Sequence, residues 1–187
     1  NENLLPDMIS SKEKSNNRKL RIWCAASSSG EEPYTLAMTV FNHIKPNNGW
    51  DVKILATDIS TRILQKAIEG TYKMDLLKDI PPRITSSHFS KVSVDKTNYY
   101  RAKDHLKDII TFRRFNLMTE KFPFKHPFDF IFCRNVMIYF DPQTQHTLVK
   151  KFYDCLPKNG HLFIGHSETL SKNDNDFKYV QPAIYQR

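Results

Sequence analysis

Glycine and cysteine are both scarce in this chain. Its 187 residues include five glycines and three cysteines. So few glycines argue against a nucleotide-binding loop built on repeated glycines, which is the kind of loop that cradles a pyrophosphate. Three cysteines are too few for a disulfide framework and are typical of a reducing compartment, so we expect a cytoplasmic protein.

Long apolar runs are missing as well. No apolar segment approaches the ~20 residues that a membrane-spanning helix needs, and the first residues do not resemble a signal peptide. We therefore expect no membrane insertion. The 28 lysines and arginines exceed the 20 acidic residues and give a formal charge of +8. This charge predicts an acidic partner, which could be nucleic acid, an anionic membrane face or a carboxylate-rich protein.

From residue 20 onward, apolar strands alternate with amphipathic helices. The expected strands are 20–26, 51–58, 109–115, 128–133 and 161–165, and the expected helices are 31–44, 60–69 and 143–156. A closing hairpin is expected over 177–185. This alternation predicts an α/β domain over 20–187 with a mostly parallel sheet and an antiparallel C-terminal hairpin. Residues 1–19 are mostly polar and are interpreted as a linker or a helical remnant.

Two local signals predict how helices start and stop. The hydroxyls of Ser27–Ser29 are expected to cap the helix at 31–44. Ser60 or Thr61 is expected to cap the next helix, and Gly70 to end it. The apolar face of that helix is expected to include Ile63, Leu64, Ala67 and Ile68. The segment 70–108 then breaks the alternation and is too long for a plain connection, so we expect an inserted subdomain.

Polar residues follow the predicted strands, at the edge where ligands bind in open parallel sheets. They are Ser27–Gly30, Asp58, Asn116, Arg134–Asn135 and His166–Glu168. Asp58 lies 28 residues after Gly30, where a carboxylate can accept both hydroxyls of a ribose. The alternative for Asp58 is a helix cap.

The turn after the first predicted strand has a single glycine, Gly30, followed by two glutamates. Without further glycines the backbone cannot approach a pyrophosphate closely, and Glu31 and Glu32 would repel a phosphate. This pattern disfavours NAD. It is typical of a site for a nucleoside without phosphates, and it suits a cationic one better still.

Five segments together resemble the CheR family of chemotaxis receptor methyltransferases. They are Arg21–Met38, Ile54–Ser60, Phe115–Met118, Phe128–Asp141 and Gly165–Glu168, in the family's order. The most specific of them is 128–141, which reads Phe-Asp-Phe-Ile-Phe-Cys-Arg-Asn-Val-Met-Ile-Tyr-Phe-Asp. The likeness runs from about Leu20 to the C-terminus. The family's first turn usually reads Ala-x-Ser-Thr-Gly, whereas this chain has Ser29 before Gly30.

The resemblance implies a class I S-adenosylmethionine-dependent methyltransferase, with a Rossmann-like fold and a small inserted β-subdomain at 70–108. It implies methyl transfer from S-adenosylmethionine to glutamate side chains of bacterial chemoreceptors, which leaves S-adenosylhomocysteine. The implied partners are the acidic methylation helices of receptor cytoplasmic domains. In some members a receptor's C-terminal peptide docks on the insert. We expect a monomer and no nucleic-acid partner.

The resemblance also assigns roles to residues of this chain. Asp58 would hold the cofactor's ribose, Tyr139 would lie beside the transferred methyl group, and Arg134 and Tyr139 are the implied catalytic residues. The implied cofactor-binding residues are Ala26, Gly30, Glu32, Asp58, Asn116, Leu117, Cys133 and Arg134. Asn116 and Leu117 would flank the adenine.

The residue types fit this chemistry independently. A glutamate side chain titrates near ~4.3, so at neutral pH it is already a nucleophile and needs no general base. Arg134 could orient that carboxylate with a bidentate contact, and Tyr139 could donate a hydrogen bond. We expect no metal, because His161 and His166 are five residues apart on an extended segment and point to opposite faces.

Other interpretations stay open at each of these positions. Cys133 could be a packing residue, Arg134 a surface ion pair and Tyr139 part of the core, while Glu168 is better interpreted as a turn or cap residue than as a catalytic one. The family also has an N-terminal helical domain, of which at most the last stretch is expected at 1–17. A cofactor-binding sensor or docking module without full activity is therefore an alternative function. A nucleic-acid methyltransferase and a dinucleotide oxidoreductase are more distant alternatives.

Overall fold

A seven-stranded sheet forms the centre of the computed structural model, which describes residues 4–45, 48–94, 97–170 and 176–187. Its strand order is β6-β2-β1-β7-β8-β10-β9. The strands are β1 (Lys19–Ala25), β2 (Asp51–Asp58), β6 (Ile110–Arg114), β7 (Phe130–Cys133), β8 (His161–Ile164), β9 (Lys178–Gln181) and β10 (Ile184–Gln186). The first five in this order pair in parallel, and β10 is antiparallel to both its neighbours. The predicted mostly parallel sheet with a C-terminal hairpin is confirmed.

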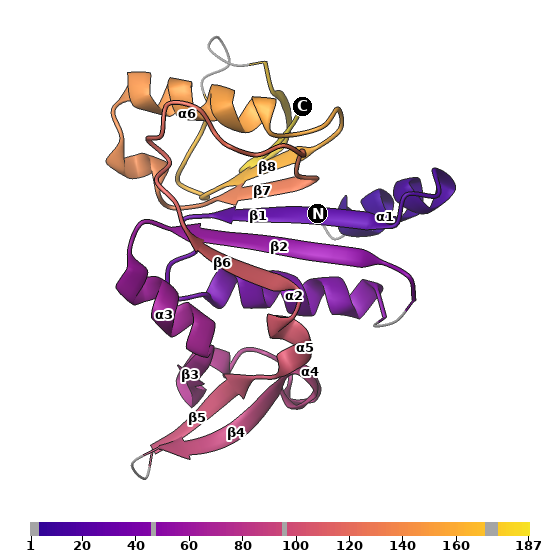
Figure 1. Ribbon diagram of the computed structural model, residues 1–187, viewed down its shortest axis with the longest axis vertical. Helices are drawn as coiled ribbons and strands as arrows, with labels where there is room; N and C mark the ends of the chain where they lie inside the picture. Colours follow the sequence, from indigo (N-terminus) through magenta and orange to yellow (C-terminus); the bar gives the residue numbers. More distant parts are fainter. Residues whose placement is uncertain (1–3, 46–47, 95–96, 171–175) are drawn as a thin grey trace.

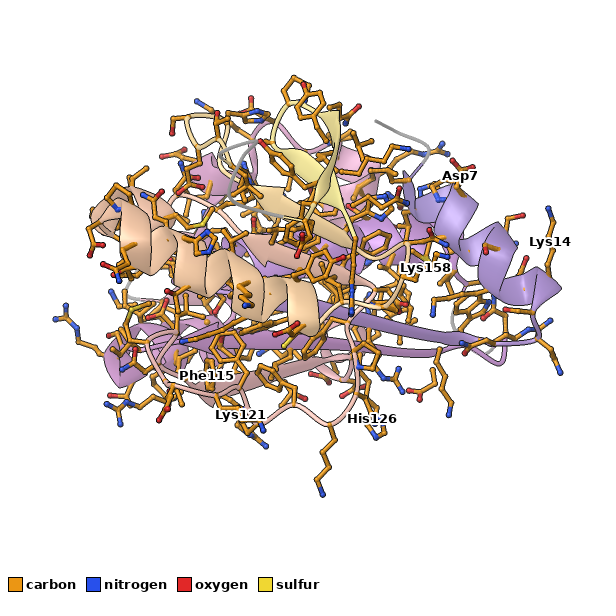
Figure 2. The ribbon with its side chains drawn as sticks, turned by 90° about the horizontal axis from the view of Figure 1, so that it is seen from above. Asp7, Lys14, Phe115, Lys121, His126 and Lys158 are labelled. Atoms are coloured by element: carbon orange, nitrogen blue, oxygen red, sulfur yellow. The ribbon has the colours of Figure 1, made fainter. Side chains whose placement is uncertain are left out.

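Helices cover both faces of this sheet. The longer ones are α1 (Leu4–Lys14), α2 (Glu31–His43), α3 (Thr61–Glu69) and α6 (Pro142–Asp154). Figure 1 shows α6 beyond β7 and β8 at one end of the molecule, with α2 and α3 on the side of β2 and β6. In Figure 2, α6 lies over the sheet, and Asp7 and Lys14 on α1 lie at the opposite end from Phe115. Within the described residues, no helix is long and apolar enough to span a bilayer.

Strand β1 separates two apolar cores because its side chains alternate between the faces. Leu20, Ile22 and Cys24 are buried on the face of α2, in one core. Trp23 and Ala25 belong to the other core, with Phe152 of α6. The fully buried Trp23 ring contacts five phenylalanine rings, which makes this core mainly aromatic. The first of these cores extends beyond the large sheet to Phe89 and Leu106.

The segment between α3 and β6 contains a second, three-stranded antiparallel sheet in the order β3-β5-β4. The elements of this segment are β3 (Thr71–Lys73), η1 (Met74–Leu77), α4 (Pro82–His88), β4 (Phe89–Val94), β5 (Thr97–Ala102) and α5 (Asp104–Lys107). Figure 1 shows β4 and β5 projecting at the end of the molecule farthest from α6. The division of the chain at 1–19, 20–187 and 70–108 stays a prediction. Residues 1–3 and 95–96 lie outside the described residues.

Two local expectations are wrong. No side chain of Ser27–Ser29 caps α2, because the cap is Gly30 itself in the left-handed conformation at φ 97°. The Ser29 hydroxyl instead donates to the Glu31 carboxylate at 2.8 Å. Ile68 is 47% exposed, since α3 buries only the narrow stripe of Leu64 and Ala67.

The other two local expectations hold. The Ser60 hydroxyl accepts a hydrogen bond from the Ile63 amide at 3.4 Å and so caps α3. Gly70 ends α3 in the left-handed conformation, in which a residue with a side chain would be strained.

Candidate functional site

The strand order of the large sheet reverses beside β1, whose neighbours are β2 on one side and β7 on the other. Beyond the carboxyl ends of parallel strands, such a reversal opens a crevice between loops that turn to opposite sides. Three segments meet there: the turn 26–30 after β1, the end of β2 at Asp58, and the loop 134–139 after β7. Most of the predicted site residues therefore share this edge.

The turn after β1 has an unusual backbone. Ala26, Ser28 and Gly30 have φ angles of 71°, 49° and 97°. A Cβ atom at Gly30 would come within 2.8 Å of the Tyr72 Oη and 2.9 Å of the Ala67 Cβ, so only glycine fits against α3 and β3. The Tyr72 hydroxyl donates to the Ser29 carbonyl oxygen at 2.9 Å. Tyr72 of β3 thus helps to fix the turn after β1.

Asp58 connects this turn to the start of α3. One carboxylate oxygen accepts from the Ser28 amide at 3.0 Å, and the other accepts from the Ser60 amide at 2.9 Å. The helix cap itself is Ser60, so capping is not the role of Asp58. Each carboxylate oxygen can accept a second hydrogen bond, which leaves Asp58 able to bind a ribose diol.

Glu32 and Arg134 form an ion pair that joins α2 to the loop after β7. The Arg134 guanidinium donates to the Glu32 carboxylate at 3.1 Å, and their side chains are 42% and 21% exposed. Burial raises the pKa of Glu32, while the hydrogen bond and charge of Arg134 act in the opposite direction. The ion pair left open for Arg134 is therefore present, and it joins two of the predicted cofactor-binding residues.

The remaining predicted cofactor residues differ in exposure. Asn116 is exposed, and its side-chain oxygen accepts from the Met118 amide at 2.9 Å. Leu117 and Cys133 are buried in the core of Trp23, and burial raises the pKa of the Cys133 thiol well above its usual range. The Cys133 side chain is a packing residue in this structure. Contacts of these three residues with a cofactor stay predictions.

Tyr139 ends the short helix η2 (Met137–Tyr139) in the loop after β7. Its side chain is 78% exposed, which excludes the alternative that it belongs to the core. Met137 is 3% exposed and anchors this helix in the core. An exposed tyrosine beside a buried anchor is free to contact a bound molecule.

The sequence did not predict the contacts of two residues, Glu168 and Tyr72, with the loops of the site. Glu168 is 7% exposed and accepts hydrogen bonds from three backbone amides, one of them at Gly165 in its own turn. That bond agrees with the preferred interpretation of Glu168 as a turn residue. The other two bonds reach the loop after β7. Tyr72 gave no signal, because its partner Ser29 is 43 residues away along the chain.

The polar groups at this edge fit S-adenosylmethionine. Asp58 offers acceptors for ribose hydroxyls, and Glu32 offers a carboxylate to a cationic ligand. The Ser27 hydroxyl is buried and has no hydrogen-bond partner among the described residues. A buried hydroxyl of this kind can serve a ligand. Within the same residues, no three potential metal ligands cluster.

Comparison with known proteins gives the family. Residues 1–185 match the family model described as "CheR methyltransferase, SAM binding domain". A chemotaxis protein methyltransferase of Borreliella burgdorferi is 44% identical over 188 residues, covering 100% of this chain and 65% of the relative. A probable chemotaxis protein methyltransferase of Rhizobium etli is 43% identical, covering 91% of this chain and 62% of the relative.

A chemotaxis protein methyltransferase of Escherichia coli is 37% identical over 166 residues, which are 88% of this chain and 57% of the relative. The chain thus spans between 57% and 65% of the length of these three relatives. The family match agrees with the predicted fold and with a site that suits S-adenosylmethionine. The chain belongs to the CheR methyltransferase family and contains its S-adenosylmethionine-binding domain.

Proposed function

We propose that this protein transfers a methyl group from S-adenosylmethionine to glutamate side chains of a bacterial chemoreceptor. One observation carries the proposal: Glu32, Asp58 and Arg134 come from three separate elements and converge at the reversal of strand order in a chain of the CheR family. Three chemotaxis methyltransferases similar over most of this chain support the same activity.

The proposed cofactor-binding residues divide the ligand between them. Asp58 would accept the ribose hydroxyls, and Asn116 and Leu117 would lie against the adenine. The turn from Ala26 to Gly30 and the carboxylate of Glu32 would face the amino-acid part. Glu31 and Glu32 in the first turn of α2 favour a ligand without phosphates, since they would repel an anion there.

The chemistry asks the protein for positioning rather than for proton transfer. When bound, S-adenosylmethionine supplies an electrophilic methyl group on a positively charged sulfur. Arg134 would orient the substrate carboxylate, and Tyr139 would donate a hydrogen bond near the transferred methyl group. The substrate glutamate is already ionised at neutral pH, so neither residue has to accept a proton.

The substrate and setting are part of the same proposal. The charge of +8 complements an acidic receptor helix. The strand β4 lies at an edge of the three-stranded sheet, where an extended receptor peptide could add a further strand. The protein would act as a monomer in the cytoplasm, without a nucleic-acid partner.

Transfer of a labelled methyl group tests this function. The protein is incubated with labelled S-adenosylmethionine and, in separate reactions, receptor-containing membranes, DNA or RNA. Label should appear on the receptor and be released by mild base, because a glutamate methyl ester is base-labile. Label found only on nucleic acid, or base-stable label on the receptor, would falsify the proposal.

A further inference from the structure

The carboxylate of Glu168 is a buried polar group whose contacts reach beyond its own turn. Its Oε2 atom accepts from the Gly165 amide at 2.5 Å and from the Asn135 amide at 3.1 Å. Its Oε1 atom accepts from the Ile138 amide at 3.3 Å. Glu168 therefore connects the loop after β8 to the loop after β7, which lies 30 to 33 residues earlier in the chain.

The two amides that Glu168 binds outside its own turn lie next to the proposed catalytic residues. Asn135 directly follows Arg134, and Ile138 directly precedes Tyr139. Asn135 adopts a left-handed backbone with φ 58°, which turns the chain out of β7. The carboxylate thus holds both ends of the segment that joins the two proposed catalytic residues.

Side-chain contacts hold the rest of this segment. Met137 is its buried anchor, while Ile138 and Tyr139 are 53% and 78% exposed. On the far side, the Gln145 side-chain amide donates to the carbonyl oxygens of Met137 and Phe140 at 2.9 and 3.0 Å. At the amino end, Val136 packs against the same core and the Arg134 side chain pairs with Glu32, while Glu168 binds the backbone amide of Asn135 between them.

Gly165 makes the close approach between the two loops feasible. A Cβ atom there would lie 2.8 Å from the Glu168 Oε2 and 3.0 Å from the Asn135 nitrogen. Any side chain at this position would push the carboxylate away from the loop after β7. The glycine and the carboxylate form one arrangement.

We propose that Glu168 is a positioning residue, which holds the 134–139 loop so that Tyr139 meets the methyl group being transferred. The inference rests on the proposed function for the role of Tyr139. A carboxylate suits the task because both of its oxygens accept hydrogen bonds. The side-chain amide of Glu168→Gln would keep one acceptor oxygen and turn an N–H₂ group toward a backbone N–H. The substitution therefore breaks part of the hydrogen bonding between residue 168 and the loop after β7 with almost no change in shape.

A double-mutant cycle on the full protein tests this role. Glu168→Gln should lower kcat about 10- to 100-fold, and the same change in a Tyr139→Phe background should lower it less than about threefold. The affinity for S-adenosylhomocysteine should change little in either background. Equal fold losses in both backgrounds, or an unchanged kcat, would overturn the inference.

Asp129→Asn is the matched control. Asp129 is also 7% exposed, and its carboxylate accepts from the Arg21 amide at 2.8 Å. It lies just before β7, at the opposite end of that strand from the site. Asp129→Asn should lower stability while kcat and KM stay as in the original protein. A kcat loss as large as that of Glu168→Gln would mean that both losses reflect general destabilisation.

Hydrogen exchange gives a readout that needs neither cofactor nor activity. In the ligand-free protein, the amides of Asn135 and Ile138 should exchange faster in Glu168→Gln than in the original protein or in Asp129→Asn. Unchanged exchange at these two amides would refute the inference that Glu168 holds the 134–139 loop. If the protein transferred no methyl group but showed this exchange pattern, the proposed function would be contradicted, while the inference that Glu168 holds the 134–139 loop would stand.

Discussion

Glu32 is a carboxylate in a place where burial works against its charge. Burial raises its pKa, and Arg134 only partly opposes this shift. A carboxyl group with a raised pKa contributes stability below its unfolded pKa and loses that contribution as the pH rises through its folded pKa. Ionising Glu32 in the folded protein therefore carries an energetic cost, which is typical of residues retained for binding.

Replacing Glu32 by Gln should separate stability from binding. We expect a higher free energy of unfolding at pH 7 than in the original protein, with the gain shrinking as the pH falls toward ~4. Urea unfolding at several pH values measures it. The affinity for S-adenosylmethionine should fall at the same time. A variant less stable at pH 7, with a deficit that shrinks in acid, would contradict this account.

Asp58 should matter for binding more than for catalysis. Asp58→Ala should weaken cofactor binding about tenfold or more, because hydrogen bonds to a charged group contribute ~1.5–3 kcal/mol. Isothermal titration calorimetry with S-adenosylhomocysteine measures the loss. Ser60→Ala is the control, because it removes the side-chain cap of α3 but no proposed ligand contact. This variant should keep its affinity for S-adenosylhomocysteine.

Tyr139→Phe should show the reverse pattern. It removes only a hydroxyl from an exposed ring, so folding should be unaffected. We expect slower methyl transfer, by about 10- to 100-fold in kcat, with a small effect on cofactor affinity. If Tyr139→Phe and Asp58→Ala lost affinity equally, the division of roles between them would be wrong.

At the scale of elements, α4 and α5 meet α2 through aromatic and imidazole rings. His88 of α4 and His105 of α5 have their Nδ1 and Nε2 atoms 2.9 Å apart, and both rings contact Phe41 of α2. Burial lowers the pKa of His88, helped by His105 and Lys103. Burial and Lys103 also lower the pKa of His105, while Asp104 and Asp108 oppose them. The surroundings of both histidines therefore favour their neutral form.

Stability should therefore fall in mild acid. A histidine with a lowered pKa contributes stability above its unfolded pKa, near ~6.5, and this contribution is lost as the pH falls through the folded pKa. His105→Gln should flatten the dependence of unfolding free energy on pH between about 6.5 and 5. Leu148→Ala, which removes no titrating group and lies on α6 in the other core, should lower stability at every pH and keep the original slope.

The elements themselves could be predicted because their burial patterns are periodic. Strand β2 alternates exposed and buried residues along most of its length, and the signals of Ser60 and Gly70 are local. The contacts of Glu168 with Ile138 and of Tyr72 with Ser29 join segments 30 and 43 residues apart. Such pairs depend on strand order and register, which one sequence does not specify. For the same reason the exposure of Ile68 could not be predicted.

For the molecule as a whole, the scarcity of glycine is explained by the site. The turn after β1 needs glycine at one position, Gly30, where α3 and Tyr72 leave no room for a Cβ atom. A phosphate-binding loop would need several such positions. The acidic start of α2, with Glu31 and Glu32, disfavours a phosphate beside it, so we expect this sheet edge to bind S-adenosylmethionine and not a dinucleotide.

Calorimetric titration of the protein with S-adenosylmethionine, S-adenosylhomocysteine and NAD tests that claim most directly. We predict saturable binding of the first two ligands at a single site and no detectable binding of NAD. Failure of both adenosyl ligands to bind, or displacement of S-adenosylhomocysteine by NAD, would contradict the account.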